Sequence, residues 1–138
     1  MSPSLQTLFR LREHARKESE SKLRRAETLR DEQQARLEAV QAAMAQARDA
    51  KDPADVLALS QYHAWQVRQR LTERRESTKL QQRERETETA RTSHHVRVRD
   101  ELAIQNAIEA ANDREMALDR MAETKTLDEI GARMRRVA

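Results

Sequence analysis

The sequence predicts an all-α protein, an antiparallel two-helix coiled-coil hairpin whose second helix is longer than its first. Three observations support this fold. The 138 residues include one Gly and two Pro, so residues that form turns are too rare for a chain with many short elements. Only 2% of the residues are aromatic, whereas strands favour aromatic and β-branched residues. Ala, Leu, Glu, Gln and Arg dominate instead, and apolar residues recur every three or four positions.

The first helix is expected from about residue 3 to about residue 50. Pro3 fits the first helical position, because the N–H that proline lacks would have no partner inside the helix there. One face of this segment carries mostly apolar residues in steps of three or four, which is typical of a narrow coiled-coil seam. The predicted seam consists of Leu8, Leu11, Ala15, Ser19, Leu23, Ala26, Leu29, Gln33, Leu37, Val40, Met44 and Ala47.

The connection is expected at about residues 50–53, and the second helix at about residues 53–137. Asp52 and Pro53 form the only internal start signal, with Asp52 as the N-cap. Asp55 adds negative charge near the positive end of the helix dipole. A connection this short makes the two helices antiparallel neighbours.

The two helices are expected to differ in length. A symmetric turn near residue 52 places residues opposite each other when their numbers sum to about 104, for example Leu37 and Val67. The second helix then outruns the first by roughly 35 residues. About residues 100–138 therefore form a C-terminal overhang of a single coiled-coil domain, residues 1–138. The apolar residues of this overhang have no partner inside the chain, which predicts an external partner.

The sequence contains no constellation of catalytic or metal-binding residues. His94 and His95 are adjacent, so on a helix their side chains point about 100° apart and cannot hold one ion. Gly131 is the single glycine, which leaves no glycine-rich loop to bind phosphate. We therefore expect a protein that is not an enzyme and uses no cofactor and no metal.

The chain is expected to be cytoplasmic and not inserted in a membrane. No apolar run approaches the roughly 18 residues that a spanning helix needs. The first residues lack the apolar middle region of a signal peptide. The absence of cysteine suits a reducing compartment.

Residues 68–85 form a basic stretch with three interpretations. Its cations are Arg68, Arg70, Arg74, Arg75, Lys79, Arg83 and Arg85. The favoured interpretation is a solvated face, because interleaved glutamates offer i,i+4 ion pairs. The alternatives are contacts with an acidic protein surface or with nucleic-acid phosphates. No aromatic residue lies in the stretch to stack on bases, so nucleic-acid binding is not expected.

Tyr62 and Trp65 are two of only three aromatic residues, and they lie one helical turn apart near the start of the second helix. One interpretation is that they pack against Val40 and Met44 at the end of the hairpin. The other is that they are partly exposed as docking anchors, because Trp and Tyr are enriched in interface hot spots.

Three segments are similar to segments of one protein family. They are LQTLFRLREHARKESESKL (residues 5–23), LALSQYHAWQVRQRL (residues 57–71) and NDREMALDRMAETKTLDEIGARMRR (residues 112–136). The third is the most specific, with Lys125, then Leu127-Asp128-Glu129, an apolar residue and basic residues. In this layout the chain resembles the FliJ proteins of the flagellar type III export apparatus and their injectisome counterparts, the YscO proteins.

The resemblance implies a non-enzymatic stalk of a bacterial type III protein export apparatus, in secretion or in flagellum biogenesis. Such a stalk stands in the pore of the hexameric export ATPase, promotes its assembly and activity, and links it to the export gate, a membrane protein with a cytoplasmic domain. Family members also handle export chaperones. The implied location is cytoplasmic and peripheral, at the inner face of the bacterial cytoplasmic membrane, and the implied free state is a monomer.

The resemblance also assigns residues to these partners. Tyr62 and Trp65 match the patch that family members use against the export gate. The residues expected to bind the export ATPase lie in the overhang and are Leu118, Met121, Leu127, Ile130, Arg133, Met134, Arg135 and Arg136.

Two other functions are kept as alternatives. The first is a structural coiled coil that oligomerises through the overhang, which a stable dimer or tetramer at micromolar concentration would favour. The second is a nucleic-acid-binding helical hairpin, whose binding would weaken steeply with salt. Both flagellar and injectisome membership fit the sequence.

Overall fold

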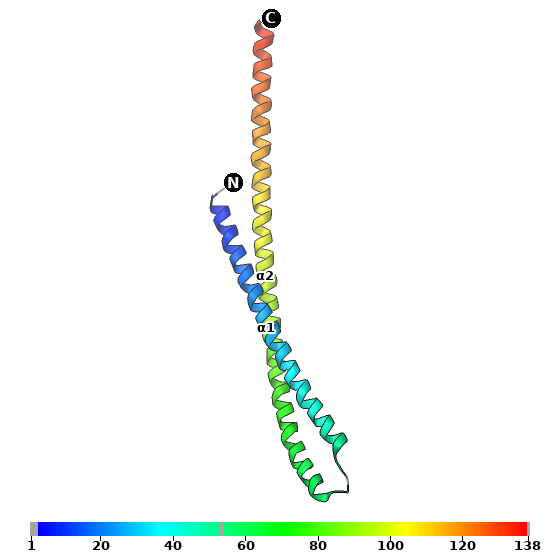
Figure 1. Ribbon diagram of the computed structural model, residues 1–138. Helices are drawn as coiled ribbons and strands as arrows, with labels where there is room; N and C mark the ends of the chain where they lie inside the picture. Colours follow the sequence, from blue (N-terminus) through cyan, green and yellow to red (C-terminus); the bar gives the residue numbers. More distant parts are fainter. Residues whose placement is uncertain (1–2, 53, 138) are drawn as a thin grey trace. The chain divides into compact units, whose positions relative to one another are not determined.

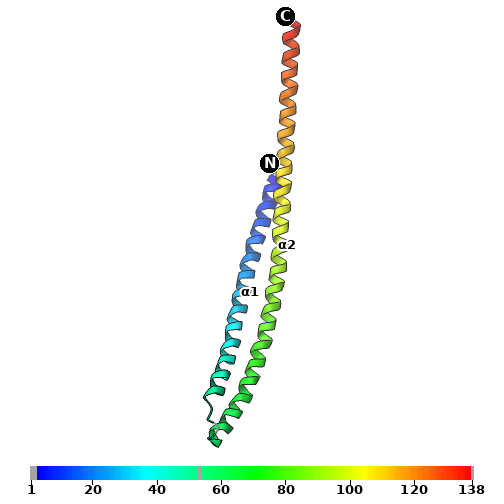
Figure 2. The same ribbon diagram turned by 90° about the vertical axis from the view of Figure 1, so that its right-hand side faces the viewer.

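The computed structural model describes residues 3–52 and 54–137, which form two helices joined by a short connection (Figures 1 and 2). Helix α1 spans Pro3–Ala50 and helix α2 spans Val56–Val137. The described residues contain no strand. The predicted fold class is therefore confirmed: two helices pack against each other, and the second is the longer.

The connection between the helices differs from its prediction at the N-cap of α2. Asp55, not Asp52, caps this helix: its carboxylate accepts a hydrogen bond from the Ala58 N–H at 3.0 Å, and its carbonyl accepts the first helical bond from Leu59 at 2.9 Å. The Asp52 carboxylate accepts from the Ala54 N–H at 3.0 Å and so forms a local turn. Both aspartates offer the same capping chemistry, so sequence alone favoured the one before proline. Pro53, the predicted first residue of the helix, lies outside the described residues.

The chain divides into two compact units. Residues 18–95 form the first, here called the hairpin unit, which contains the connection. Residues 3–17 of α1 and 96–137 of α2 belong to the second, here called the terminal unit.

In the hairpin unit both helices present a seam in which buried or half-buried residues alternate in steps of three and four, the heptad spacing of coiled coils. The α1 seam agrees well with the prediction and includes Gln33 and Leu37, both buried. On α2 the seam consists of Leu59, Tyr62, Gln66, Gln69, Glu73, Glu76, Leu80, Arg83, Thr87, Ala90 and His94. Most of these residues are polar, so the spacing of apolar residues does not reveal the α2 seam.

Polar side-chain contacts give the register of the hairpin unit. Ser19 Oγ lies 3.0 Å from His94 Nδ1, and Thr87 Oγ1, which donates to the Arg83 carbonyl of its own helix at 2.8 Å, lies 3.2 Å from the Ala26 carbonyl across the seam. The paired residue numbers sum to 113 in both cases, not to about 104 as a symmetric turn predicted. Val67 is accordingly 67% exposed and is not a seam partner of Leu37. The prediction failed because the turn is not symmetric. The first residues of α2 lie beyond the end of α1, and the connection spans this offset.

In the terminal unit, ion pairs join the two helices. Arg12 pairs with Asp100 at 3.5 Å and Arg16 with Glu101 at 2.5 Å. The predicted seam residue Leu11 is 62% exposed, because the next heptad position is taken by Arg12. The half-buried apolar residues of this unit continue the same spacing and include Leu5, Leu8, Phe9, Ile104, Ile108 and Ala111.

Helix α1 covers more of α2 than the sequence predicted. Half-buried residues of α2 continue to Asn112, so the overhang begins near residue 113 and not near residue 100. The ion pairs of the terminal unit agree with this difference, because the residue numbers of Arg12 and Asp100 sum to 112 and those of Arg16 and Glu101 to 117, both above the predicted 104. We call residues 113–137 the uncovered tail.

Candidate functional site

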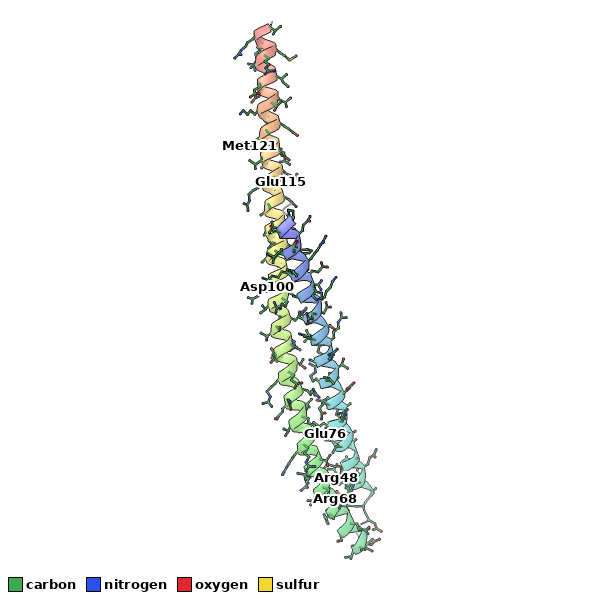
Figure 3. All side chains as sticks on the ribbon, turned by 90° about the vertical axis from the view of Figure 1, so that its left-hand side faces the viewer. Arg48, Arg68, Glu76, Asp100, Glu115 and Met121 are labelled. Carbon is green, nitrogen blue, oxygen red and sulfur yellow. The ribbon has the colours of Figure 1, made fainter. Side chains whose placement is uncertain are left out.

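The uncovered tail is the best candidate site in the terminal unit. It is helical throughout and forms the orange-to-red end of α2 in Figure 1. All its residues are exposed except Gly131 and Ala132, which are half-buried. All eight residues that the sequence assigned to the export ATPase lie here, and Met121 is labelled in Figure 3. A helix with this much exposed apolar surface is suited to bind another protein.

The structure does not place these eight residues on one face. Leu118 and Leu127 are nine residues apart, so on an α-helix they point in directions about 180° apart. Met121 lies near the side of Leu118, whereas Ile130 and Met134 lie on the side of Leu127. The apolar pattern therefore changes faces between Ala122 and Leu127. Ala122 and Leu127 are five residues apart, whereas residues on one helix face recur every three or four positions. This spacing is the signal in the sequence that could have revealed the two faces.

The side of the tail that carries Leu127 has a heptad pattern of its own. Its seven positions follow one another in steps of four and three: Met116, Arg120, Glu123, Leu127, Ile130, Met134 and Val137. Five of the seven are apolar, and Arg120 and Glu123 are charged. We call this set the tail stripe. All seven residues are exposed. Sequence analysis missed Met116, because two charged residues separate it from the rest.

The three arginines near the end of the tail surround the helix. Arg136 points along the side of Leu118, and Arg133 and Arg135 lie on the two flanks between the faces. None of them has an ion-pair partner among the described residues. This end of the tail is therefore a free cationic and apolar surface.

The two aromatic residues lie in the hairpin unit, where both are half-buried. The ring centroids of Tyr62 and Trp65 are 6.3 Å apart, and the Lys51 ammonium lies 5.1 Å from the Tyr62 ring centroid. Tyr62 also lines a small pocket with Met44 and Arg48. Tyr62 is thus close to Met44, as the packing interpretation requires, while the exposed part of both rings leaves the docking interpretation open.

The basic stretch has fewer ion pairs than expected. Lys79 pairs with Glu76 at 3.6 Å and Arg83 with Glu86 at 3.1 Å, and both pairs have i,i+3 spacing, not the expected i,i+4. The other cations of the stretch make no ion pair among the described residues: Arg68, Arg70, Arg74, Arg75 and Arg85. Their spacing distributes them around α2 and does not concentrate them on one face.

The seam of the hairpin unit contains a polar contact that sequence analysis did not foresee. The Gln33 side-chain amide donates to the Glu76 carboxylate and, at 3.1 Å, to the Glu76 carbonyl. This hydrogen bond, with smaller contributions from Lys79 and Arg36, holds the pKa of Glu76 below its usual value although partial burial opposes the effect. Gln33 is 3% exposed. The contact therefore fixes the register at a position where neither helix offers an apolar side chain.

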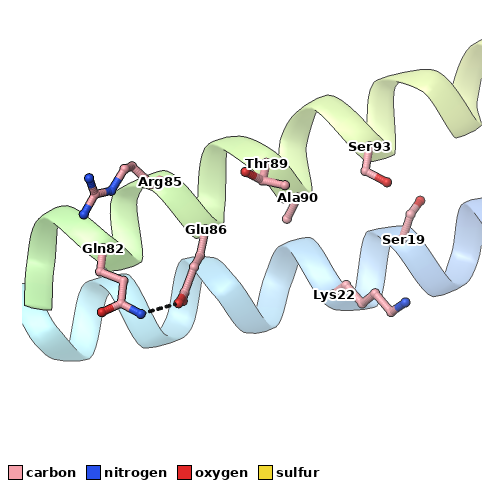
Figure 4. A pocket seen from close by; sticks show the side chains of 8 residues that line it. All are labelled: Ser19, Lys22, Gln82, Arg85, Glu86, Thr89, Ala90 and Ser93. Carbon is pink, nitrogen blue, oxygen red and sulfur yellow. Dashed lines mark hydrogen bonds between the residues drawn. The ribbon is translucent and has the colours of Figure 1, made fainter.

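A groove of about 490 Å³ runs along one side of the hairpin unit (Figure 4). Small side chains form part of its wall, including Ser19, Ala90 and Ser93. Figure 4 shows Gln82 donating to Glu86, at 3.2 Å, within the groove. No group of three or more His, Cys, Asp or Glu residues that could hold a metal ion occurs in the described part of the chain.

Neither described helix is both long and apolar enough to cross a membrane. Comparisons with known proteins give no match: no protein-family model, no curated protein and no solved structure matches the chain.

Proposed function

We propose that this protein is a non-enzymatic stalk of a bacterial type III protein export apparatus, and that its uncovered tail binds the hexameric export ATPase. The observation that carries the proposal is the tail itself, an exposed helix with apolar residues on two opposite faces. A helix in a narrow pore meets protein on all sides, so two opposite apolar faces suit a central position better than a one-sided contact. The resemblance of residues 112–136 to the end of the export stalk family supports the same assignment.

The free arginines of the tail fit this role. Arg133, Arg135 and Arg136 lie on different sides of the helix and have no carboxylate partner among the described residues. A ring of ATPase subunits can offer acidic groups from several directions, and such charge complementarity directs association. The stalk would act by contacting some conformations of the hexamer better than others, which is the condition for any shift in population. It supplies no catalytic group of its own.

Tyr62 and Trp65 are proposed to bind the cytoplasmic domain of the export gate. Both rings are half-buried, so they are held in place by the hairpin and still offer aromatic surface. Aromatic anchors of this kind are enriched among the residues that dominate binding energy. The other proposed partners are export chaperones. With these partners the protein would be cytoplasmic and peripheral at the inner face of the membrane, without insertion into it.

Deletion of residues 124–138 tests the ATPase assignment. The shortened chain should keep its hairpin, because the deleted residues make no seam contact, and it should no longer stimulate the export ATPase of the same organism. Circular dichroism checks the fold and phosphate release measures the ATPase rate. If the shortened chain stimulates as well as the full chain, the assignment of the tail is wrong.

A structural coiled coil is the second candidate function, and the heptad spacing of the tail stripe favours it. The two candidates differ in their prediction for the ATPase. A stalk binds and stimulates the enzyme, whereas a purely structural protein leaves the ATPase rate unchanged at any concentration.

A further inference from the structure

The tail stripe can pair with its own equivalent in antiparallel orientation. When two tails are paired about residue 125, Met116 of each lies opposite Met134 of the other, Arg120 opposite Ile130, and Glu123 opposite Leu127. All seven stripe residues are exposed in the single chain. The same surface on each copy then meets its own equivalent, as twofold symmetry requires.

The charges of the tail favour the same arrangement. Residues 113–123 contain four acidic and two basic residues, and residues 124–137 contain four basic and two acidic ones, so the halves carry −2 and +2. Antiparallel pairing places the acidic half of one copy beside the basic half of the other. At the flank of the stripe, Asp119 of each copy lies opposite Arg133 of the other, and the symmetry makes this contact twice.

The presence of glycine at position 131 has no explanation within the single chain. It lies inside α2 without a positive φ, so neither a turn nor a cap requires glycine. A Cβ added there would meet only the end of the Arg135 side chain, at 3.8 Å. Glycine is an unfavourable helix residue compared with alanine. In the paired tails, Gly131 lies opposite Ala117 of the other copy on the second flank, where small residues let two helices approach closely.

We propose that the uncovered tail binds the tail of a second copy of this chain, as a short antiparallel coiled coil through the tail stripe. The inference goes beyond the proposed function and does not depend on it. Arg120 and Glu123 take two of the seven stripe positions, and charged residues there weaken a coiled coil. The pairing is therefore weak and reversible. Monomers prevail at low micromolar concentration, and the dimer forms as the concentration rises.

Pairing of this kind would cover Leu127, Ile130 and Met134, three of the residues proposed to bind the ATPase. A second copy and the ATPase then compete for the same face of the tail. At high concentration the free protein would keep its own docking surface covered, and binding of the ATPase would release one copy from the other.

Sedimentation equilibrium of the full chain, from about 1 to several hundred micromolar, tests the proposal. The parent chain should show a reversible monomer–dimer equilibrium. Asp119→Arg brings two arginines together at each flank contact and should weaken the dimer roughly tenfold or more. Arg133→Asp should do the same by bringing two acids together. The double variant D119R/R133D restores opposite charges only in the antiparallel register, and its dissociation constant should return to within about threefold of the parent value.

Two further variants complete the experiment. Asp128→Arg changes the same type of charge in the tail but outside the stripe and its flanks, so the dissociation constant should stay within about threefold of the parent value. Ile130→Arg should abolish the dimer while circular dichroism shows an unchanged hairpin, because residue 130 faces Arg120 of the other copy and the variant places two arginines opposite each other. The proposal is overturned if the parent chain is monomeric over the whole range, if Ile130→Arg dimerises as well as the parent, or if D119R/R133D is no better than the single variants. Because the measurement uses the purified chain alone, its failure leaves the ATPase proposal to be decided by its own assay.

Discussion

Few apolar side chains are buried between the two helices. In the described structure, only Leu37 and Leu80 are both apolar and buried. Leu80→Ala should lower the free energy of unfolding by about 2 kcal/mol, the lower end for a large-to-small change in a core, because a two-helix seam leaves each side chain partly accessible. Val67→Ala is the matched control and should change it by less than about 0.5 kcal/mol. Urea unfolding measures both. An equal loss in the two variants would contradict the observed register.

The Gln33 and Glu76 contact makes stability depend on pH in a defined direction. The pKa of Glu76 is lower in the folded chain than its ordinary value of 4.5, so its contribution is fully present above that value and is lost as the pH falls through the folded pKa. Gln33→Leu removes the hydrogen bond and should reduce the loss of thermal stability between neutral and acidic pH. Melting temperatures of both proteins across this range provide the measurement. Parallel pH curves would show that the contact does not contribute.

Residue types also set how much of the seam could be predicted. The α1 seam was predicted almost completely, because Leu23, Leu37, Val40 and Met44 keep the heptad spacing. The middle of the α2 seam was not predicted, because polar residues such as Glu76 and Thr87 fill its positions. Such residues belong to a seam only when they have partners on the other helix: Gln33 contacts Glu76, and the Ala26 carbonyl contacts Thr87. A partner across a seam is not visible in a single sequence until the register is known.

At the scale of the elements, the start of α2 can be tested directly. Asp55→Ala removes the observed N-cap and should lower the free energy of unfolding by about 1 kcal/mol. Asp52→Ala removes only a local turn contact and should have a smaller effect. Chemical unfolding of the two variants side by side gives the comparison. A larger loss for Asp52→Ala would restore the predicted cap and contradict the observed one.

The elements also show why the extent of the tail was mispredicted. Both helices and their order follow from the periodicity and from the rarity of Gly and Pro. The register of the hairpin unit does not follow from them. The first residues of α2 lie beyond the end of α1, and the size of this offset depends on the path of the connection. In the terminal unit, half-buried residues of α2 continue to Asn112, so the tail begins near residue 113 and not near residue 100. The residues assigned to the tail site remained inside it, but helical geometry divided them between two faces.

For the molecule as a whole, the main feature is the uncovered tail of α2, whose residues are exposed in the described structure except for Gly131 and Ala132. The hairpin unit supplies a defined helical scaffold, held by heptad contacts and by polar contacts such as that of Gln33 with Glu76. The terminal unit carries the uncovered tail, with apolar residues on two faces and free arginines. Exposed apolar and cationic side chains of this kind suit the binding of another protein.

The composition of the proposed complex with the export ATPase is the most direct test of the stalk function. A central stalk occupies the single pore of a hexamer, so the native mass of the complex should correspond to one chain for six ATPase subunits, even with the chain in excess. The complex should be lost when residues 124–138 are removed. One chain bound to every ATPase subunit, or no complex at all, would contradict the proposal that this protein is a stalk.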